Sequence, residues 1–305
     1  VIHTHVSVKT TPEQREALKA AYGKAKRYAD YRKLLEEQKD IDGVSVADAL
    51  TRIGYAGTQM PGEVPGGMFA AYFEAHIEQG PVLEAHGLPI GVVPGALGQR
   101  WYDVTVTGME AHAGPTPMEL RRDALVAASQ LVLAVNRIAL DHAPHGRATV
   151  GCIDGYPNSR NVIPGRVSLT VDLRAADDAA LDSMAAALAR ACDELAQPGR
   201  FEVERKEVVY FPPQPFEPRL VQAVRDGAHT LGLDSLDVIS GAGHDAVYMA
   251  RVAPTAMIFV PCKDGISHNE IEDAQPGHLE AGCNVLLHAM LRCCGRIESA
   301  QGAPA

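Results

Sequence analysis

Residues 166–196 read RVSLTVDLRAADDAALDSMAAALARACDELA, a stretch in which one hydrophobic period gives way to another. In RVSLTVDLRA (166–175) apolar and polar residues alternate, which predicts a strand with one buried face. In DAALDSMAAALARACDELA (178–196) the apolar residues recur at helical spacing, which predicts an amphipathic helix. A strand that leads directly into a helix is the basic unit of α/β architecture.

The same kinds of element extend on both sides of this stretch. Strands are predicted at 101–108 (WYDVTVTG), 148–154 (ATVGCID) and 201–211 (FEVERKEVVYF), and a helix at 118–140. Together these elements follow the order β-α-β-β-α-β, the ferredoxin-like order, in about 110 residues. The segment PPQPFEP (212–218) predicts a linker out of this region. We therefore expect a separate inserted domain at 98–212.

The flanking sequence predicts an α/β domain that the insertion interrupts. Before the insertion we expect helices at 11–39 and 44–55, a Gly/Pro linker at 57–67, a strand in 68–80 and a loop-rich hinge at 80–98. After it we expect a helix at 219–232, strands at 235–239 and 256–260, and a closing helix at 276–297. The predicted domains are thus an N-terminal portion of the α/β domain (1–97), the insertion (98–212) and a C-terminal portion of the α/β domain (213–305).

Composition narrows the class of protein. The chain has 305 residues, of which 46% are hydrophobic and 22% charged, as expected of a folded globular protein. A net charge of -10 and a pI near 5.6 argue against partners that are nucleic acids or membrane surfaces. The six cysteines form no CxxC pair and the N-terminus has no signal-peptide pattern, so we predict a cytoplasmic protein with reduced thiols.

The segment FEAHIEQGP (73–81) places His76 between Glu74 and Glu78. If the segment is a strand, the three side chains share one face, because alternate residues of a strand point the same way. Three interpretations follow: a metal site, an acid/base site, or a polar edge strand that faces water. Local sequence does not choose among them.

Two more histidines lie near predicted strand ends, where ligands of α/β proteins tend to gather. His268 lies in VPCKDGISHNE (260–270), just beyond the strand predicted at 256–260. His244 lies in SGAGHDA (240–246), where Asp245 is placed either to orient it or to cap the following helix. For both histidines, a ligand role and a structural role stay open.

The insertion holds a second set of polar candidates. His112 lies in GMEAHAGPTP (108–117), Asn161 in PNSRNVIPG (157–165), and Arg174 at the end of the strand that opened this section. A guanidinium at a strand end is suited to clamp a carboxylate with two hydrogen bonds. The structural alternatives are that His112 and Asn161 are turn residues and that Arg174 forms a surface ion pair.

The combination of these motifs resembles a known family. FEAHIEQGPVLE, GQRWYDVTVTGMEAHAGPTPMELRRDAL, PNSRNVIPGRV, SGAGHDA and IFVPCKDGISHNE follow one another in one order. Together they resemble the hydantoinase/carbamoylase family of metal-dependent amidohydrolases, over roughly residues 40–295 of the chain. That family includes N-carbamoyl-L-amino-acid hydrolase, beta-ureidopropionase and allantoate amidohydrolase.

The resemblance implies a fold and a chemistry. Its members have a zinc-aminopeptidase-like catalytic domain with two metal ions, interrupted by a ferredoxin-like lid domain that also forms a homodimer. A divalent metal is implied, zinc first, with manganese, cobalt or nickel as alternatives. The metal ions activate a water molecule that attacks the amide or ureido carbonyl of a small carboxylate substrate. The choice among N-carbamoyl amino acid, N-carbamoyl-beta-alanine and allantoate stays open.

The resemblance also assigns roles to individual residues. It implies that His76 is a ligand of one metal ion and His268 a ligand of the other. It implies a substrate-binding set of Gln99, His112, Asn161, Arg174 and Gly243. Within that set Asn161 and Arg174 would hold the substrate carboxylate. The catalytic role falls to His112, which would polarise the carbonyl and stabilise the oxyanion, acting across the dimer.

The sequence departs from the family at its N-terminal end. The family site also needs another histidine, a bridging aspartate and adjacent glutamates, one of them the general base. Residues 1–35 contain no such set, and neither the His3/His5 pair nor Glu36-Glu37 has the family's flanking residues. We therefore expect a chain that lacks part of the active site, binds zinc weakly and hydrolyses substrate poorly or not at all.

Two other hypotheses remain beside an impaired amidohydrolase. In the first, the chain is an inactive remnant that acts as a dimerisation or carboxylate-binding module, and it would then hold no metal. In the second, it is an aminopeptidase of the same clan. The segments AHAGPTPMELRRDAL and GISHNE resemble the carbamoylase branch and argue against the aminopeptidase.

Overall fold

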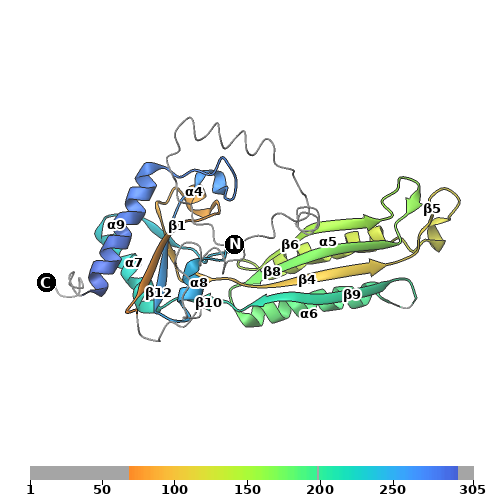
Figure 1. Ribbon diagram of the computed structural model, residues 1–305, viewed down its shortest axis with the longest axis horizontal. Helices are drawn as coiled ribbons and strands as arrows, with labels where there is room; N and C mark the ends of the chain where they lie inside the picture. The colour runs from red at the N-terminus through yellow and green to blue at the C-terminus, as the bar shows by residue number, and fades with distance from the viewer. Residues whose placement is uncertain (1–68, 198, 295–305) are drawn as a thin grey trace, which may run out of the picture. The chain divides into compact units, whose positions relative to one another are not determined.

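The computed structural model describes residues 69–197 and 199–294, all of them within the compact unit Val64–Ala305. Its elements form two four-stranded sheets, which lie side by side along the molecule (Figure 1). Each sheet has its own hydrophobic core. The helices predicted at 11–39 and 44–55 and the linker at 57–67 lie outside the described residues, as do His3, His5 and the Glu36-Glu37 pair.

One sheet, here called the antiparallel sheet, has the strand order β6-β8-β4-β9. Its strands are β4 (Gly98–Thr107), β6 (Arg147–Tyr156), β8 (Arg166–Ala175) and β9 (Glu202–Phe211), and all neighbours are antiparallel. Helix α5 (Ala124–Asp141) joins β4 to β6, and α6 (Asp178–Leu195) joins β8 to β9. The predicted order β-α-β-β-α-β is therefore confirmed.

The stretch that predicted the fold shows why this sheet has one covered face. Along β8 the buried residues are Val167, Leu169, Val171, Leu173 and Ala175, every second position. Helix α6 begins where the Asp177 carboxylate accepts a hydrogen bond from the backbone N–H of Ala180, and its buried stripe includes Leu181 and Leu188. Burial of each such leucine contributes about 1.5–3 kcal/mol. Helices α5 and α6 pack on this face, and the other face of β8 carries polar side chains.

Helix α5 begins later than predicted. The expected helix at 118–140 is divided into a 3-10 turn, η2 (Met118–Leu120), and α5 proper. The break occurs because the Asp123 carboxylate accepts hydrogen bonds from the N–H groups of Leu125 and Val126, which fixes the helix start. By length and composition α5 is apolar enough to cross a membrane, but a core helix passes the same test, and one face of α5 is buried in this core.

The second sheet, here called the mixed sheet, has the order β1-β12-β2-β11. Its strands are β1 (Tyr72–Ile77), β2 (Ile90–Val93), β11 (Ser235–Asp237) and β12 (Thr255–Val260). The pairs β1–β12 and β11–β2 are parallel, whereas β12–β2 is antiparallel. Three helices contact it: α7 (Pro218–Thr230), α8 (Asp245–Met249) and α9 (Pro276–Cys293). The strands and helices predicted after the insertion are confirmed, with ends that shift by a few residues.

The prediction of a loop-rich hinge at 80–98 is wrong. This segment contains a short helix, α4 (Val82–His86), the strand β2, and the two-residue strand β3 (Gly95–Ala96). All four residues of β2 are buried between neighbouring strands, so the apolar run IGVV has no polar alternation to mark it as a strand. Gly87 ends α4 and Pro89 and Pro94 flank β2, whereas Gly91 and Gly95 lie inside β2 and β3.

Two short ladders complete the described fold. Strand β3 pairs antiparallel with β10 (Gln214–Pro215), which lies inside the linker predicted at 212–218. Strand β5 (Ala111–His112) pairs antiparallel with β7 (Val162–Ile163) beyond the far end of β4. These ladders fix the loops that carry several of the predicted site residues.

Candidate functional site

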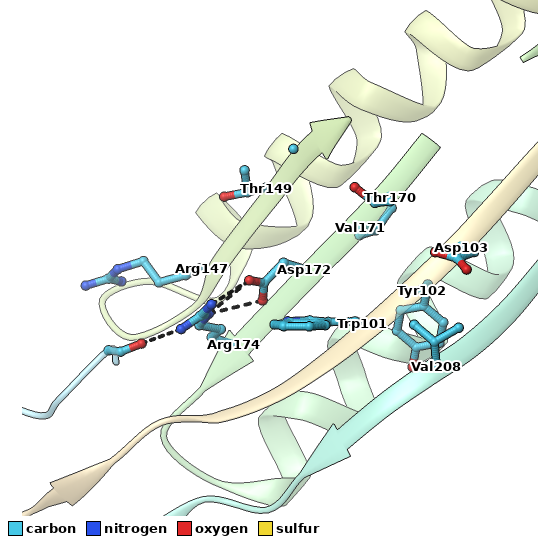
Figure 2. A pocket seen from close by; sticks show the side chains of 12 residues that line it. Trp101, Tyr102, Asp103, Arg147, Thr149, Thr170, Val171, Asp172, Arg174 and Val208 are labelled. Atoms are coloured by element: carbon cyan, nitrogen blue, oxygen red, sulfur yellow. Dashed lines mark hydrogen bonds and ion pairs between the residues drawn. The ribbon is translucent and has the colours of Figure 1, made fainter. Parts of the chain in front are cut away.

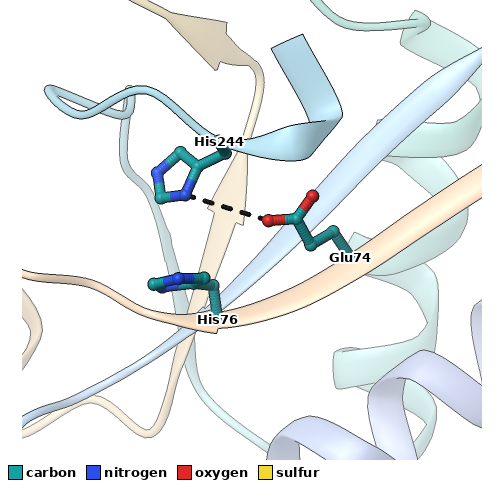
Figure 3. A group of neighbouring side chains, drawn as sticks. All are labelled: Glu74, His76 and His244. Atoms are coloured by element: carbon teal, nitrogen blue, oxygen red, sulfur yellow. Dashed lines mark ion pairs between the residues drawn. The ribbon is translucent and has the colours of Figure 1, made fainter. Parts of the chain in front are cut away.

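Glu74, His76 and His244 form a cluster on the mixed sheet (Figure 3). Their ligand-type atoms all lie within 4.8 Å of one another. Glu74 and His76 alternate on β1, so both side chains leave the same face of the strand. His244 is the residue directly before α8, and α8 contacts β1. Residues more than 160 positions apart in sequence therefore meet in one site.

The ring of His76 is held in one tautomer. Its Nδ1 lies 2.8 Å from the carbonyl oxygen of Ile77, and because a carbonyl only accepts, Nδ1 carries the proton and donates it. The other ring nitrogen, Nε2, is then the unprotonated one. Metal-binding histidines are commonly oriented by such a bond from the nitrogen that does not bind the metal.

His244 is a buried and neutral imidazole. Its ring lies 4.7 Å from that of His76 and 5.5 Å from that of Phe259, measured between ring centroids. Burial, with a smaller contribution from His76, lowers the pKa of His244 from 6.5 to about 4. On the side away from Glu74, its Nε2 lies 2.7 Å from the hydroxyl of Ser240. A neutral imidazole is the form of histidine that binds a metal ion.

The carboxylate of Glu74 is fixed by two donors. It accepts a 2.7 Å hydrogen bond from the N–H of Ala246 and a 3.1 Å bond from the hydroxyl of Tyr72. Its other oxygen lies 3.8 Å from Nδ1 of His244. Burial raises the pKa of Glu74 above its ordinary value, although both hydrogen bonds oppose the shift. Burial and the neighbouring Glu74 raise the pKa of Tyr72 to about 12, so this phenol stays a donor.

This donor set suits a divalent transition metal. Two imidazoles and one carboxylate are the ligand types of zinc sites, and three protein ligands leave a position open for water or substrate. The cluster fits the predicted role of His76 and adds Glu74 and His244, whose roles the sequence left open. Glu78 instead accepts hydrogen bonds from the N–H groups of Val82 and Leu83 at the start of α4, beyond the end of β1.

His268 lies on the loop after β12 and the 3-10 turn η3 (Lys263–Gly265). Its backbone has a φ of 56°, and its N–H donates a 2.9 Å hydrogen bond to Glu272. Among the described residues, the three-membered cluster does not include His268. Its assignment as a second metal ligand therefore stays a prediction.

The predicted substrate-binding residues fall into two groups. Gln99 and Arg174 are direct neighbours across β4 and β8, and His112 is paired with Val162, the residue after Asn161, across β5 and β7. Gln99 lies near the start of β4, whereas β5 follows its end. At about 3.3 Å per residue, an extended ten-residue strand separates the two groups by roughly 25–30 Å.

Arg174 clamps a carboxylate, as its position at a strand end suggested, but the carboxylate is internal (Figure 2). Its Nε and one terminal nitrogen donate to Asp172, the latter at 2.7 Å. Its remaining terminal nitrogen donates a 2.6 Å hydrogen bond to the carbonyl of Gly241. That carbonyl belongs to the SGAGHDA loop, which also contains Gly243, so Arg174 ties the antiparallel sheet to the loop that carries His244.

Sequence patterns missed Ser240 and left His244 and Asp172 without an assigned role. Strand alternation brings Glu74 to His76, but nothing local indicates that His244 reaches the same point. The SGAGHDA motif was the available signal, because two glycines beside a histidine permit a close approach of the backbone.

Comparison with known proteins identifies the family of this chain. The profile of peptidase family M20/M25/M40 matches residues 32–292. The chain is 42% identical to an N-carbamoyl-L-amino-acid amidohydrolase of Rhizobium meliloti over 261 residues, which cover 86% of this chain and 62% of that protein. It is 33% identical to an allantoate amidohydrolase of Bacillus subtilis over 252 residues, 82% of this chain and 61% of that protein.

A solved structure agrees with the sequence comparison. The chain superposes on an amidase of the hydantoinase/carbamoylase family from Burkholderia multivorans with a TM-score of 0.79 and 57% identity. The match covers 83% of this chain and 61% of that one, so the chain spans about three fifths of the length of the relatives it matches. The predicted α/β fold class and family resemblance are confirmed: this chain belongs to peptidase family M20/M25/M40.

Proposed function

We propose that this protein takes part in metal-dependent hydrolysis of a linear C–N bond in a small carboxylate, of the N-carbamoyl amino acid or allantoate type. The observation that carries the proposal is the cluster of Glu74, His76 and His244. The similarity of the chain to N-carbamoyl-L-amino-acid and allantoate amidohydrolases supports the same reaction class. Hydrolysis of a ureido group with one water yields the free amine, carbon dioxide and ammonia.

The cluster provides the place for the metal ion. His76 would bind through Nε2, because its Nδ1 is committed to the Ile77 carbonyl, and Glu74 and His244 lie within reach of the same ion. When bound, a divalent ion lowers the pKa of a coordinated water and so supplies hydroxide at neutral pH. Zinc suits this donor set best, with manganese, cobalt or nickel as alternatives, and His268 is proposed as a ligand of a second ion.

The antiparallel sheet provides the substrate contacts in this proposal. Gln99 and Arg174 face each other across two strands, and Arg174 reaches the loop of Gly243, so these three residues would contact the substrate together. Asn161 and His112 lie beyond the far end of β4, and His112 is exposed. A second copy of the chain would bring His112 to the reacting carbonyl, where it would polarise the carbonyl oxygen and stabilise the oxyanion.

A homodimer through the antiparallel sheet has structural support. Val126, Leu133 and Leu140 are 56%, 71% and 61% exposed and recur every seven residues along α5, which places them on one face. The neighbouring strand β6 forms an edge of the sheet among the described residues. An apolar helix face beside a strand edge is a surface that a second copy can cover. We propose 98–212 as the lid and dimerisation domain, flanked by catalytic portions at 1–97 and 213–305.

The test measures ammonia release by the purified chain after loading with zinc, manganese, cobalt or nickel. The substrates are N-carbamoyl-L-amino acids, N-carbamoyl-beta-alanine and allantoate. We expect slow turnover, below that of the Rhizobium meliloti relative, that a chelator and His76→Gln both abolish. Slow turnover is expected because residues 1–35 lack the family's HxD and Glu-Glu-Gly motifs. A chain that neither binds metal nor turns over any substrate contradicts the proposal and favours the binding-module hypothesis. The cytoplasmic location stays a prediction.

A further inference from the structure

The two imidazoles of the cluster are oriented through different ring nitrogens. In His76 the nitrogen bonded to the protein is Nδ1, 2.8 Å from the Ile77 carbonyl, which leaves Nε2 for a metal ion. In His244 it is Nε2, 2.7 Å from Oγ of Ser240. This leaves Nδ1 of His244, which lies 3.8 Å from a carboxylate oxygen of Glu74 (Figure 3). The two partners also differ in kind, because a carbonyl only accepts a hydrogen bond, whereas a hydroxyl can donate or accept one.

The backbone of Ser240 is fixed, so its hydroxyl hydrogen is the part that is free to change direction. Ser240 forms a parallel bridge with Ala96 of β3. Its N–H donates to the carbonyl of Gly95 at 2.9 Å, and its own carbonyl accepts from the N–H of Leu97 at 2.8 Å. The residue is 1% exposed, so water does not compete for the hydroxyl. Rotation about the Cβ–Oγ bond moves the hydrogen and leaves the oxygen in place.

The hydroxyl oxygen of Ser240 has three polar neighbours and carries one hydrogen. The N–H of Ala242 donates to the oxygen at 3.1 Å. The other two neighbours are both able to accept: Nε2 of His244 at 2.7 Å and the carbonyl oxygen of Ala242 at 3.1 Å. The hydrogen points to one of these two at a time. Two arrangements of hydrogens therefore fit the same positions of the heavier atoms.

In the first arrangement the Ser240 hydroxyl donates to Nε2 of His244. The hydrogen of the neutral ring is then on Nδ1, which faces the carboxylate of Glu74. Without a metal ion this arrangement is the favourable one, because an N–H group faces a carboxylate, whereas an unprotonated Nδ1 would present a lone pair to it. It is unsuited to metal binding, since a nitrogen that carries a hydrogen has no lone pair to offer.

In the second arrangement the hydroxyl turns to the carbonyl of Ala242, and its oxygen accepts a hydrogen bond from Nε2–H of His244. The lone pair of Nδ1 is then free and lies in the cluster with Nε2 of His76 and the carboxylate of Glu74. Each buried donor keeps an acceptor in both arrangements, so neither one carries the cost of an unpaired polar group.

We propose that Ser240 lets His244 exchange tautomers when the cluster takes up a metal ion, so that the ring binds through Nδ1. One N–H bond breaks at Nδ1 and one forms at Nε2, so the ring stays neutral, and Ser240 keeps its hydrogen throughout. Ser240 is thus a positioning residue that acts through His244. The exchange deepens the proposed function and rests on it for the metal ion, but it requires no hydrolysis.

The first test identifies the protonated ring nitrogen directly. In the full chain labelled with ¹⁵N at histidine, the imidazole ¹⁵N chemical shifts distinguish Nδ1–H from Nε2–H. The signals of His244 are those that disappear in His244→Gln, and those of His76 are assigned in the same way with His76→Gln. We expect His244 to carry its hydrogen on Nδ1 with chelator present and on Nε2 with zinc bound. We expect His76 to carry it on Nδ1 in both states.

The second test measures zinc affinity. Ser240→Ala leaves Nε2–H without an acceptor, and we expect the affinity to fall by about 10–100-fold, the range for loss of a residue that orients a metal ligand. Ser240→Thr keeps a hydroxyl and should recover most of that loss. The control is Leu181→Ala, which removes a fully buried leucine from the core of the antiparallel sheet and so lowers stability away from the cluster. A merely structural role of Ser240 would make Ser240→Ala and Leu181→Ala alike in zinc affinity.

Two results would overturn the exchange: a His244 hydrogen on the same nitrogen with and without zinc, or a zinc affinity of Ser240→Ala equal to that of the wild type. If Ser240→Ala does not fold, judged by circular dichroism, the measurement on the wild type decides alone. Zinc that shifts the signals of His76 while His244 keeps its hydrogen on Nδ1 contradicts the exchange only. Zinc that shifts neither histidine contradicts the metal cluster of the proposed function as well.

Discussion

The hydroxyl of Ser240 lies 2.7 Å from Nε2 of His244, and both residues are buried. The same hydroxyl contacts the backbone N–H and carbonyl of Ala242, both at 3.1 Å. Ser240 therefore fixes the far side of the imidazole whose Nδ1 faces Glu74. The orientation of His244 in the cluster is set by a residue that is not itself a candidate ligand.

We expect Ser240→Ala to lower the free energy of unfolding by about 1–3 kcal/mol, because it leaves a buried ring nitrogen and a backbone N–H without a partner. Urea denaturation measures the change. The matched control is Ser129→Ala, whose exposed hydroxyl donates to the carbonyl of Leu125 on α5. The control should change stability by less than about 0.5 kcal/mol. Equal losses in the two variants would contradict the role given to Ser240.

Replacement of the central ligand should remove metal binding. His76→Gln deletes Nε2 from the cluster. Loss of a residue that only hydrogen-bonds a metal ligand lowers metal affinity by about 10–100-fold, and we expect the loss of zinc affinity in His76→Gln to be larger. Competition with a zinc-sensitive dye measures the affinity. His86→Gln is the control, because His86 is exposed on α4 and lies outside the cluster. Unchanged zinc affinity in His76→Gln would place the metal elsewhere.

The apolar stripe of α5 predicts a charge-sensitive dimer. Leu133→Glu puts a carboxylate at the centre of the stripe, and burying it in an interface is costly. We expect light scattering after size exclusion to show dimers of the wild type and monomers of the variant. Leu279→Glu, at an exposed leucine of α9, should stay dimeric. A wild type that is monomeric at every concentration would refute the dimer proposal.

Gly108 fixes the start of the loop that carries His112. A Cβ at this position would overlap the carbonyl oxygen of Arg122, whereas a Cβ at Gly155 meets nothing within 4 Å. We expect Gly108→Ala to cost more than about 2 kcal/mol of stability and Gly155→Ala less than about 0.5 kcal/mol. Thermal denaturation of the two variants side by side measures the difference, and similar melting temperatures would be the contrary result.

Cys192 should make stability fall in alkaline solution. Burial raises the pKa of its thiol from 9.0 to about 11, and the residue is 4% exposed. The unfolded chain therefore loses this proton at lower pH than the folded protein. The raised pKa of Cys192 contributes at most about 3 kcal/mol to the free energy of unfolding. This contribution is fully present below about pH 9 and is lost as the pH rises to about 11.

The measurement for Cys192 compares urea denaturation of the wild type with that of Cys192→Ala across this pH range. Other groups titrate in both proteins, so the informative quantity is the difference between the two pH slopes. We expect the variant to have the shallower slope. Parallel pH dependences would show that the thiol does not contribute.

The elements that sequence predicted well are those whose hydrophobic period is unambiguous. β8 alternates between apolar and polar residues over ten residues, which excludes a helix there. α6 keeps an apolar stripe at helical spacing over eighteen residues, which excludes a strand there. β2 was missed because its four residues IGVV, between Pro89 and Pro94, carry no hydrophobic period. Its identity as a strand depends on β12 and β11 on either side, which no local pattern reveals.

The sequence predicted only part of the candidate site, for a similar reason. Strand alternation brings Glu74 to His76, and family resemblance singled out His76. His244 reaches them because β1 pairs in parallel with β12, with His76 opposite Phe259. A pairing across more than 180 residues depends on packing of the whole sheet, and no periodicity near either strand encodes it.

The short ladder of β3 and β10 has a consequence for how this chain is assembled. Ala96 and Gln214 are direct antiparallel partners, so the chain leaves the mixed sheet and returns to it at adjacent points. Such partners lie about 4.5–5.5 Å apart, a gap that a two-residue hairpin turn spans. The whole segment between them is topologically a hairpin loop. Excision of this segment and its replacement by Asn-Gly would separate the antiparallel sheet from the mixed sheet without cutting a strand of either.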